Sequence, residues 1–288
     1  DRRYGHTSVV FDDKVWVLGG TGGGGARNDV WYSPDGENWA LATLRAPWSE
    51  RWDHASAVYD GKMWVMGGRT DSGDGFYGMS DVWYSGDGRA WTSATLSAPW
   101  GRRYGHKILV VDDHMFVIGG GGEGGWWLSK DGVSWTHWSA SDPYGIDPPV
   151  VIYRDEFWEF YESTLWSIEK DSAASKMGVY WAPWLERTGF TLFVHDDKIW
   201  MAGGRMSNDP WPGSRLMNDV WCFQPYGWQL VTDHADWPVR EQHTAVVFKD
   251  RLWIMGGTGL SVNYSNPLKY DIWVSSPEAD VRAWEGYP

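Results

Sequence analysis

Residues 3–20 read RYGHTSVVFDDKVWVLGG, and this stretch decides the fold. Residues 6–11 alternate in polarity, two aspartates follow, and a β-rich run over residues 15–18 ends at a pair of glycines. Alternation, a two-residue turn and a second β-rich run are typical of a hairpin, because such a turn reverses the chain between two antiparallel strands. We therefore expect two paired strands here.

The same stretch returns along the chain. It reads RWDHASAVYDGKMWVMGG from Arg51 and RYGHKILVVDDHMFVIGG from Arg103. It then reads RTGFTLFVHDDKIWMAGG from Arg187 and REQHTAVVFKDRLWIMGG from Arg240. The steps are 48, 52, 84 and 53 residues, and the long step holds a further copy at residues 147–171, without the Arg, the His or the Gly pair. Six units of about 48 residues thus account for the chain.

Each unit continues beyond the Gly pair with two more strands. In the first unit a third strand is expected over residues 29–33, then a Pro-Asp-Gly turn and a fourth strand opened by Trp39. One such sheet cannot bury both faces, so six sheets must stack, and this predicts an all-β, six-bladed propeller forming a single domain over residues 1–288. The expected blades span approximately residues 3–48, 51–100, 103–143, 146–184, 187–237 and 240–288.

These units resemble the kelch repeat. Arg-x-x-His opens the first strand, Gly-Gly closes the second, an aromatic residue lies in the third and a Trp in the fourth, and the resemblance covers essentially the whole chain. It implies a kelch-type propeller with strands A to D running from the central channel to the rim. The turn at residues 33–39, repeated at 85–91 and 129–135, resembles a shortened Asp-box hairpin, which implies a structural role.

Composition narrows the function classes. The formal charge of −13 disfavours nucleic acid, whose recognition depends on many cationic contacts. No apolar run approaches the length of a membrane span, so no membrane insertion is expected. The single cysteine, Cys222, excludes an intrachain disulfide, lies in a strand where other units have Tyr, and is interpreted as a packing residue. No cofactor or metal is predicted. The sequence does not identify the cellular compartment of the protein.

The 25 tryptophans are mostly explained by the repeat. Seventeen of them occupy positions in strands B, C and D that recur from unit to unit, and such positions are expected to pack one blade on the next. Four more in the D–A connections either staple neighbouring blades or line a face: Trp48, Trp100, Trp184 and Trp237. Four fall outside the pattern and are candidates for binding: Trp52, Trp126, Trp138 and Trp211.

Strand alternation places the B–C and D–A connections on one side of the sheets, which we call the B–C/D–A face. This face carries the length variation of the repeats, and variable loops on a rigid scaffold are common binding sites. Five arginines open strand A near the expected channel mouth: Arg3, Arg51, Arg103, Arg187 and Arg240. They either hold an anion or pair with loop carboxylates and carbonyls. Aromatic residues follow three of them, at Tyr4, Trp52 and Tyr104.

Two further residue sets bear on catalysis. The histidines that open strand A, at residues 6, 54, 106 and 243, are interpreted as core residues rather than as a metal ring or a base. In the fourth unit Tyr161 and Glu162 replace the Gly pair, and Glu159 falls where other units have Val. A carboxylate in an apolar strand is costly, so these three are candidate acid–base residues, unless the repeat has simply drifted.

Three functions remain open. The first is a binding module whose B–C/D–A face takes a small anion, a saccharide or a protein segment. The second is an enzyme, an isomerase or lyase acting on a sugar acid or similar anion, with arginine clamps and a glutamate base; bacterial sialic-acid epimerases are the enzymatic analogy that the kelch resemblance implies. The third is a structural module of a longer chain or larger assembly. Whether the chain is an enzyme stays undecided at this point.

Overall fold

The computed structural model describes most of the chain as β-structure. The described residues are 2–70, 77–122, 125–139, 149–161, 164–168, 175–184, 186–206, 215–224, 227–259, 271–276 and 283–287. Within these ranges there is no helix, and hence none that could cross a membrane. The chain forms two compact units, one of residues 5–148 and one of residues 1–4 with 149–288.

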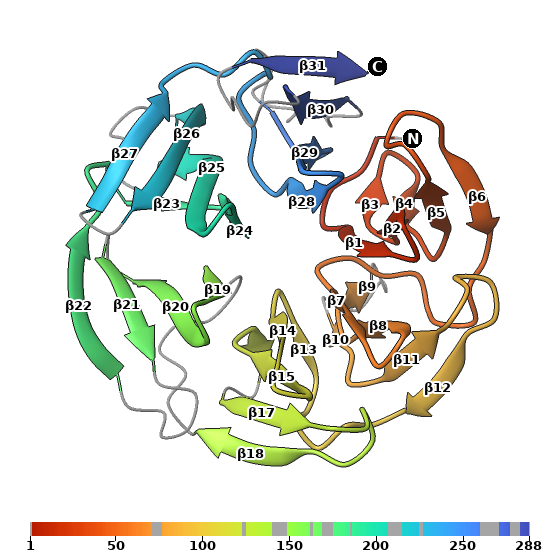
Figure 1. Ribbon diagram of the computed structural model, residues 1–288. Coiled ribbons are helices and arrows are strands. Elements are labelled where there is room, and N and C mark those ends of the chain that lie inside the picture. The colour runs from red at the N-terminus through yellow and green to blue at the C-terminus, as the bar shows by residue number, and fades with distance from the viewer. Residues whose placement is uncertain are drawn as a thin grey trace. The chain divides into compact units, whose positions relative to one another are not determined.

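The unit of residues 5–148 contains three four-stranded antiparallel sheets, each with its strands in chain order (Figure 1). The first sheet consists of β1 (Thr7–Phe11), β2 (Lys14–Leu18), β5 (Val30–Ser33) and β6 (Ala40–Thr43). The second consists of β7 (Ala55–Tyr59), β8 (Lys62–Met66), β11 (Val82–Ser85) and β12 (Thr92–Thr95). The third consists of β14 (Lys107–Val111), β15 (His114–Ile118), β17 (Trp126–Ser129) and β18 (Thr136–Ser139).

The other unit contains three more sheets of the same design. The fourth consists of β19 (Val150–Tyr153), β20 (Glu156–Tyr161), β21 (Thr164–Ile168) and β22 (Ser175–Trp181). The fifth consists of β24 (Thr191–His195), β25 (Lys198–Met206), β26 (Leu216–Gln224) and β27 (Gly227–Thr232), with the short β23 (Arg187–Thr188) added to β25. The sixth consists of β28 (Thr244–Phe248), β29 (Arg251–Met255), β30 (Ile272–Ser275) and β31 (Trp284–Tyr287). The degenerate fourth repeat thus folds as predicted.

Short ladders continue some sheets beyond the Gly pair. They pair β3 (Thr21–Gly22) with β4 (Gly25–Ala26), β9 (Arg69–Thr70) with β10 (Tyr77–Gly78), and β13 (Arg103–Tyr104) with β16 (Gly121–Gly122). Because these ladders lie at the ends of strand B, they belong to the B–C/D–A face.

The turns on the opposite side of the sheets have the predicted chemistry. Asp12 and Asp13 both have positive φ, 50° and 53°, as a two-residue hairpin turn requires. In the C–D turn of the first sheet, the Ser33 hydroxyl accepts a hydrogen bond from the Gly36 amide at 2.7 Å. The Asp35 carboxylate accepts one from the Asn38 amide at 2.7 Å. These turns satisfy their own polar groups and therefore have the structural role that was expected.

The hydrophobic core lies between neighbouring sheets. In the unit of residues 5–148, β1, β7 and β14 lie side by side, and one core cluster joins Trp16 and Leu18 of the first sheet to Met63 of the second. Trp48, in a D–A connection, meets the edge of Trp91 at 5.8 Å between ring centroids. The same contact recurs between Trp100 and Trp135, and between Trp237 and Trp284. These tryptophans staple neighbouring sheets, as one of the two interpretations proposed.

Two tryptophans outside the repeat pattern also pack in the core. Trp126 is 2% exposed and stacks on Trp138 with 5.1 Å between centroids. Trp138 in turn meets the edge of Phe116, which stands where most other sheets have Trp. Trp181 is one of the seventeen tryptophans at recurring strand positions that were expected to pack between blades. That prediction is wrong for Trp181, which is 70% exposed. Strand β22 ends at Trp181, so this residue is not at the strand start that other sheets use.

The Gly pair is required by close packing on both sides. A Cβ at Gly68 would lie 2.7 Å from the Cβ of His54 in the same sheet. A Cβ at Gly67 would lie 2.7 Å from Cε1 of His106 in the next sheet. Both glycines also have positive φ, 54° at Gly67 and 97° at Gly68. The pair therefore lets two sheets approach at the point where strand A of each begins.

We expect Gly68→Ala to lower the free energy of unfolding by about 2 kcal/mol or more, because the new methyl group meets Cβ and Cα of His54 and the Trp52 carbonyl oxygen at a strained φ. Urea denaturation measures this change. Gly23→Ala is the control, since nothing lies within 4 Å of the added Cβ. Equal effects of the two substitutions would contradict this account of the Gly pair.

Candidate functional site

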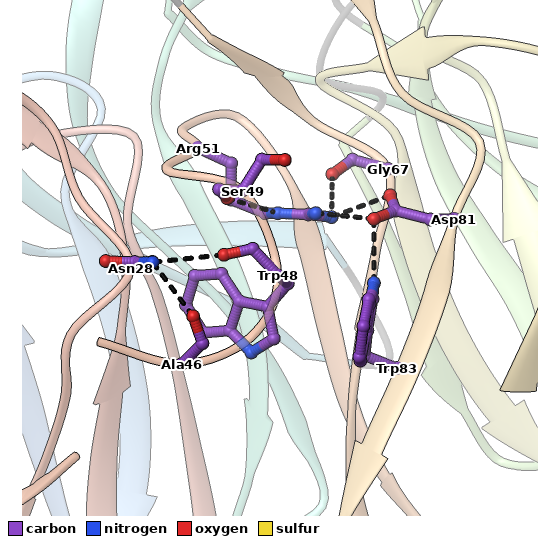
Figure 2. Close-up of polar contacts among 8 residues, drawn as sticks. All are labelled: Asn28, Ala46, Trp48, Ser49, Arg51, Gly67, Asp81 and Trp83. Carbon is purple, nitrogen blue, oxygen red and sulfur yellow. Dashed lines mark hydrogen bonds and ion pairs between the residues drawn. The ribbon is translucent and has the colours of Figure 1, made fainter. Parts of the chain in front are cut away.

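Arg51 shows what the repeated arginine does (Figure 2). Its side chain is completely buried, and Nη1 donates to the Gly67 carbonyl at 2.8 Å. Nη1 and Nη2 also donate to the two carboxylate oxygens of Asp81, at 2.9 and 2.6 Å. Nε donates to the Ser49 carbonyl at 3.1 Å, and the Trp83 indole donates to the same Asp81 carboxylate. The guanidinium is therefore held between a D–A connection and a B–C loop.

Two arginines of the other unit repeat this arrangement. Arg187 donates to Asp219 at 2.7 Å and to the carbonyl of the first glycine of its pair at 3.2 Å. Arg240 donates to Asp271 at 2.7 Å and likewise to the glycine carbonyl at 2.9 Å. Burial by itself raises the pKa of Asp271, but the hydrogen bond and charge of Arg240 outweigh it and hold that pKa below its ordinary value. These are buried, paired charges.

Arg103 donates to carbonyl groups. Its donors reach the carbonyls of Trp100, Gly119 and Gly125 at 2.7 to 3.3 Å. Arg3 is also buried, 7% exposed, and its main-chain carbonyl accepts a hydrogen bond from the Gly257 amide at 3.2 Å. Pairing with carboxylates and carbonyls is thus the role seen for Arg51, Arg103, Arg187 and Arg240. Anion binding by these arginines stays a prediction, and their burial argues against it.

The strand-A histidines are core residues, as predicted. All four are at most 6% exposed. The His54 ring nitrogen Nε2 shares a hydrogen bond of 2.9 Å with the Thr7 hydroxyl. Burial, with a smaller contribution from Arg103, lowers the pKa of His106 to about 3, so this ring is neutral at physiological pH. These rings therefore fill the space beside the Gly pairs.

The aromatic residues that follow two of the arginines surround a cation that the sequence analysis missed. The Arg69 guanidinium carbon lies 3.6 Å from the Trp52 ring centroid and 4.6 Å from that of Tyr104. Arg69 also forms an ion pair of 2.7 Å with Asp53. Trp52 is only 7% exposed. One feature of the sequence could have identified Arg69: it directly follows a Gly pair. In the structure this position pairs with Trp52, the residue that follows the repeated arginine.

An equivalent arginine lies in the other unit. Arg205 follows the Gly pair of the fifth sheet, and its Nε donates to Glu241 at 2.8 Å. Glu241 follows Arg240 as Tyr104 follows Arg103, so each arginine reaches forward to the next sheet of its own unit. In four of the sheets the ladder thus carries a pair of facing residues that varies in type. These pairs are Trp52 with Arg69, Tyr104 with Gly121, Thr188 with Arg205, and Glu241 with Thr258.

The candidate acid–base residues lie elsewhere. Glu159 is completely buried in β20, where its register matches Val17, Val65 and Val117 of other sheets. The side chain of Tyr161 and the whole of Glu162 lie outside the described residues, as does Trp211. Tyr4 is half-buried. The binding and catalytic roles of these residues stay predictions.

The single cysteine lies in the core. Cys222 is 4% exposed in a core cluster, which confirms its packing role, and burial raises the pKa of its thiol. In the part of the chain that the structure describes, no three His, Cys, Asp or Glu side chains gather closely enough to hold a metal ion.

Comparisons with known proteins agree with this geometry. Residues 1–120 match the KLHDC2/KLHL20/DRC7 Kelch-repeats domain. The chain is 25% identical to the leucine-zipper-like transcriptional regulator 1 homolog of Drosophila melanogaster, over 89% of this chain and 29% of that protein. It is also 25% identical to alpha-scruin of Limulus polyphemus, over 61% of this chain and 15% of that protein. The chain therefore spans less than a third of either relative.

A solved structure, that of YjhT, is similar over the whole chain. The TM-score is 0.78 at 15% sequence identity, and the match covers 100% of this chain and 98% of that one. At this identity the likeness concerns the fold alone.

Breaking the buried ion pair should be costly. We expect Arg51→Met to lower the free energy of unfolding by about 3–5 kcal/mol, because Asp81 would keep a poorly solvated charge without its cation. The double variant Arg51→Met/Asp81→Leu should lose less. Urea denaturation measures both.

The matched control is Arg154→Met, whose ion pair with Asp197 is 56% and 67% exposed. A loss for Arg51→Met no larger than that for Arg154→Met would show that Arg51 has no structural role.

The low pKa of His106 predicts an acid-sensitive fold. Below about pH 6.5 the unfolded chain takes up a proton that the folded chain refuses until about pH 3. Within this window, each unit by which the pH is lowered reduces the free energy of unfolding by up to about 1.4 kcal/mol because of this group. His106→Gln should therefore reduce the slope of the free energy of unfolding against pH, because about one proton fewer is taken up on unfolding. A slope in His106→Gln equal to that of the wild-type chain would contradict the prediction.

Proposed function

This chain is a kelch-repeat, six-bladed β-propeller, and we propose that it is a binding module that recognises a segment of a partner protein on its B–C/D–A face. The observation that carries the proposal is the division of this face into a constant frame and variable positions. The frame is the buried arginine with its carbonyl and carboxylate partners. The variable positions are the facing residue pairs of the short ladders.

A frame of this kind suits protein recognition. The pairs differ in chemistry from sheet to sheet, for example Trp52 with Arg69 in one and Glu241 with Thr258 in another. The backbone beneath them stays the same, because each pair follows the same arginine and the same glycines. Repeat proteins that vary surface residues on a fixed scaffold present extended surfaces rather than a single deep pocket.

The D–A connections add exposed apolar groups to this face. Leu44 is 67% exposed and Leu96 is 71% exposed, and both precede an Ala-Pro-Trp sequence at the same repeat position. The prolines of the two sequences, Pro47 and Pro99, are exposed as well. Two neighbouring sheets thus offer matching apolar contacts, which are more typical of a protein partner than of a small anion.

The small-ligand and enzyme hypotheses gain less support. Arg51, Arg187 and Arg240 are buried and already paired with carboxylates, so an incoming anion would have to displace these partners. The curated relatives are longer than the region matched here, which fits a module that works within a longer chain. We therefore make no second functional proposal.

Selection from a phage-displayed peptide library on the immobilised chain tests the proposal. Selected peptides should bind at least about tenfold more weakly to Leu44→Ser/Leu96→Ser. Val133→Ser is the matched control, because Val133 is 52% exposed in a C–D turn on the opposite side of the sheets. Peptides that respond to Val133→Ser instead, or no selected peptides at all, would argue against recognition by the B–C/D–A face.

A thermal-shift screen of sugar acids, sulfated and neutral sugars and aromatic acids tests the alternative of a small-molecule ligand. A ligand at 100 times its Kd stabilises the folded state by about 2.7 kcal/mol. Stabilisation by one anion class would favour a small-molecule site over the proposed protein partner.

A further inference from the structure

The environment of Arg69 has the composition of a cation receptor. The guanidinium lies between two aromatic rings, at 3.6 Å from the centroid of Trp52 and 4.6 Å from that of Tyr104. Asp53 supplies a carboxylate at 2.7 Å. The two rings and the carboxylate come from two neighbouring sheets of one unit. Aromatic faces combined with a carboxylate attract guanidinium and alkylammonium groups through the ring quadrupole and the negative charge.

The arginine at the same position of the fifth sheet, Arg205, has a different neighbour in the next sheet. Arg205 occupies the same repeat position and binds to the next sheet through the carboxylate of Glu241. Around Arg69, the corresponding residue is Tyr104, and the carboxylate comes from a third position, Asp53. Two aromatic rings and a carboxylate thus contact Arg69, whereas the contact of Arg205 with the next sheet is to a carboxylate.

Asp53 occupies a position that favours glycine. Its φ is +50°, and the equivalent residues Gly5, Gly105 and Gly189 have φ of 59° to 62°. Two backbone hydrogen bonds hold Asp53 there, from its own amide to the Gly5 carbonyl and from the Gly105 amide to its carbonyl. A non-glycine residue in this region is uncommon, although Asp is among those that tolerate it. The carboxylate is thus placed on a rigid backbone at a small conformational cost.

Arg69 can leave this place without loss of the ladder. Its backbone is bonded to Trp52 in both directions, at 2.9 Å each, and these bonds do not depend on the side chain. The side chains of Arg69 and Asp53 are 17% and 15% exposed, so neither is completely buried. Replacement of the Arg69 side chain by another cation would therefore leave these two backbone bonds in place.

We propose that Trp52, Asp53 and Tyr104 form a cation-binding site, that Arg69 occupies it as an internal ligand, and that an arginine or lysine side chain of a partner protein replaces Arg69 there. The site supplies a second kind of contact on the B–C/D–A face, beside the apolar one. Only the source of the cation rests on the proposed function, because the site itself can be tested with small probes.

Removal of the internal ligand opens the site. In Arg69→Ala, N-acetyl-arginine amide should bind saturably, at least about tenfold more tightly than the matching citrulline compound, which has the same shape without the charge. Isothermal titration calorimetry measures both. Adding Asp53→Asn should abolish the difference. If Arg69→Ala fails to fold, Arg69→Gln replaces it. A folded variant that binds arginine no better than citrulline would overturn the site.

The wild-type chain tests the exchange. It should bind N-acetyl-arginine amide more weakly than Arg69→Ala, since Arg69 competes, and the signal of the Trp52 indole should shift on binding. Absence of saturable binding at 100 times the Kd of the variant would overturn exchange with a partner cation. Loss of this site with retained peptide binding through Leu44 and Leu96 would leave the proposed function intact, whereas the reverse result would leave only the cation site.

Discussion

One main-chain hydrogen bond between consecutive sheets underlies the rest of the structure. The second glycine of a pair donates its amide to the carbonyl of the arginine that opens the next repeat. This bond joins Gly20 to Arg51 at 2.9 Å, Gly68 to Arg103 at 3.0 Å, and Gly204 to Arg240 at 3.0 Å. The side chain of the same arginine then turns back to the first glycine of its own sheet. The arginine and the Gly pair are therefore one device, which fixes a sheet to its neighbour and its B–C loop to its D–A connection.

This device explains why the most conspicuous charges of the sequence are not its most accessible ones. A guanidinium that forms hydrogen bonds to carbonyls and a carboxylate in the dry interior is costly to remove and cannot easily serve a ligand. The side chains beside it are under no such constraint. Trp52, Tyr104 and Glu241 each follow the arginine directly, and each makes a different contact. The residue directly after the arginine can therefore vary, whereas the arginine itself is held constant by its buried contacts.

The fold could be predicted almost completely from the sequence, because hydrophobic alternation, two-residue Asp turns and Gly pairs recur at a fixed period. Even the fourth repeat was found by its hydrophobic order alone. The placement of Trp181 failed, since strand β22 is longer than the repeat suggests and shifts the residue to an exposed end. The role of Arg51 stayed open because its partner Asp81 lies 30 residues away, and no spacing rule identifies it. Arg69 was missed because the residue directly after the Gly pair differs in type from sheet to sheet.

The Gly257 amide and the Arg3 carbonyl make the corresponding bond at the end of the chain, at 3.2 Å. The Arg3 atom belongs to the backbone, so the identity of the Arg3 side chain does not decide whether the bond can form. What decides it is the number of residues between Arg3 and the first strand. Substitution near the N-terminus is therefore tolerated at this link, whereas an inserted or deleted residue between Arg3 and His6 would move the carbonyl out of reach. The spacing of the backbone between Arg3 and the first strand is therefore the feature on which this link depends.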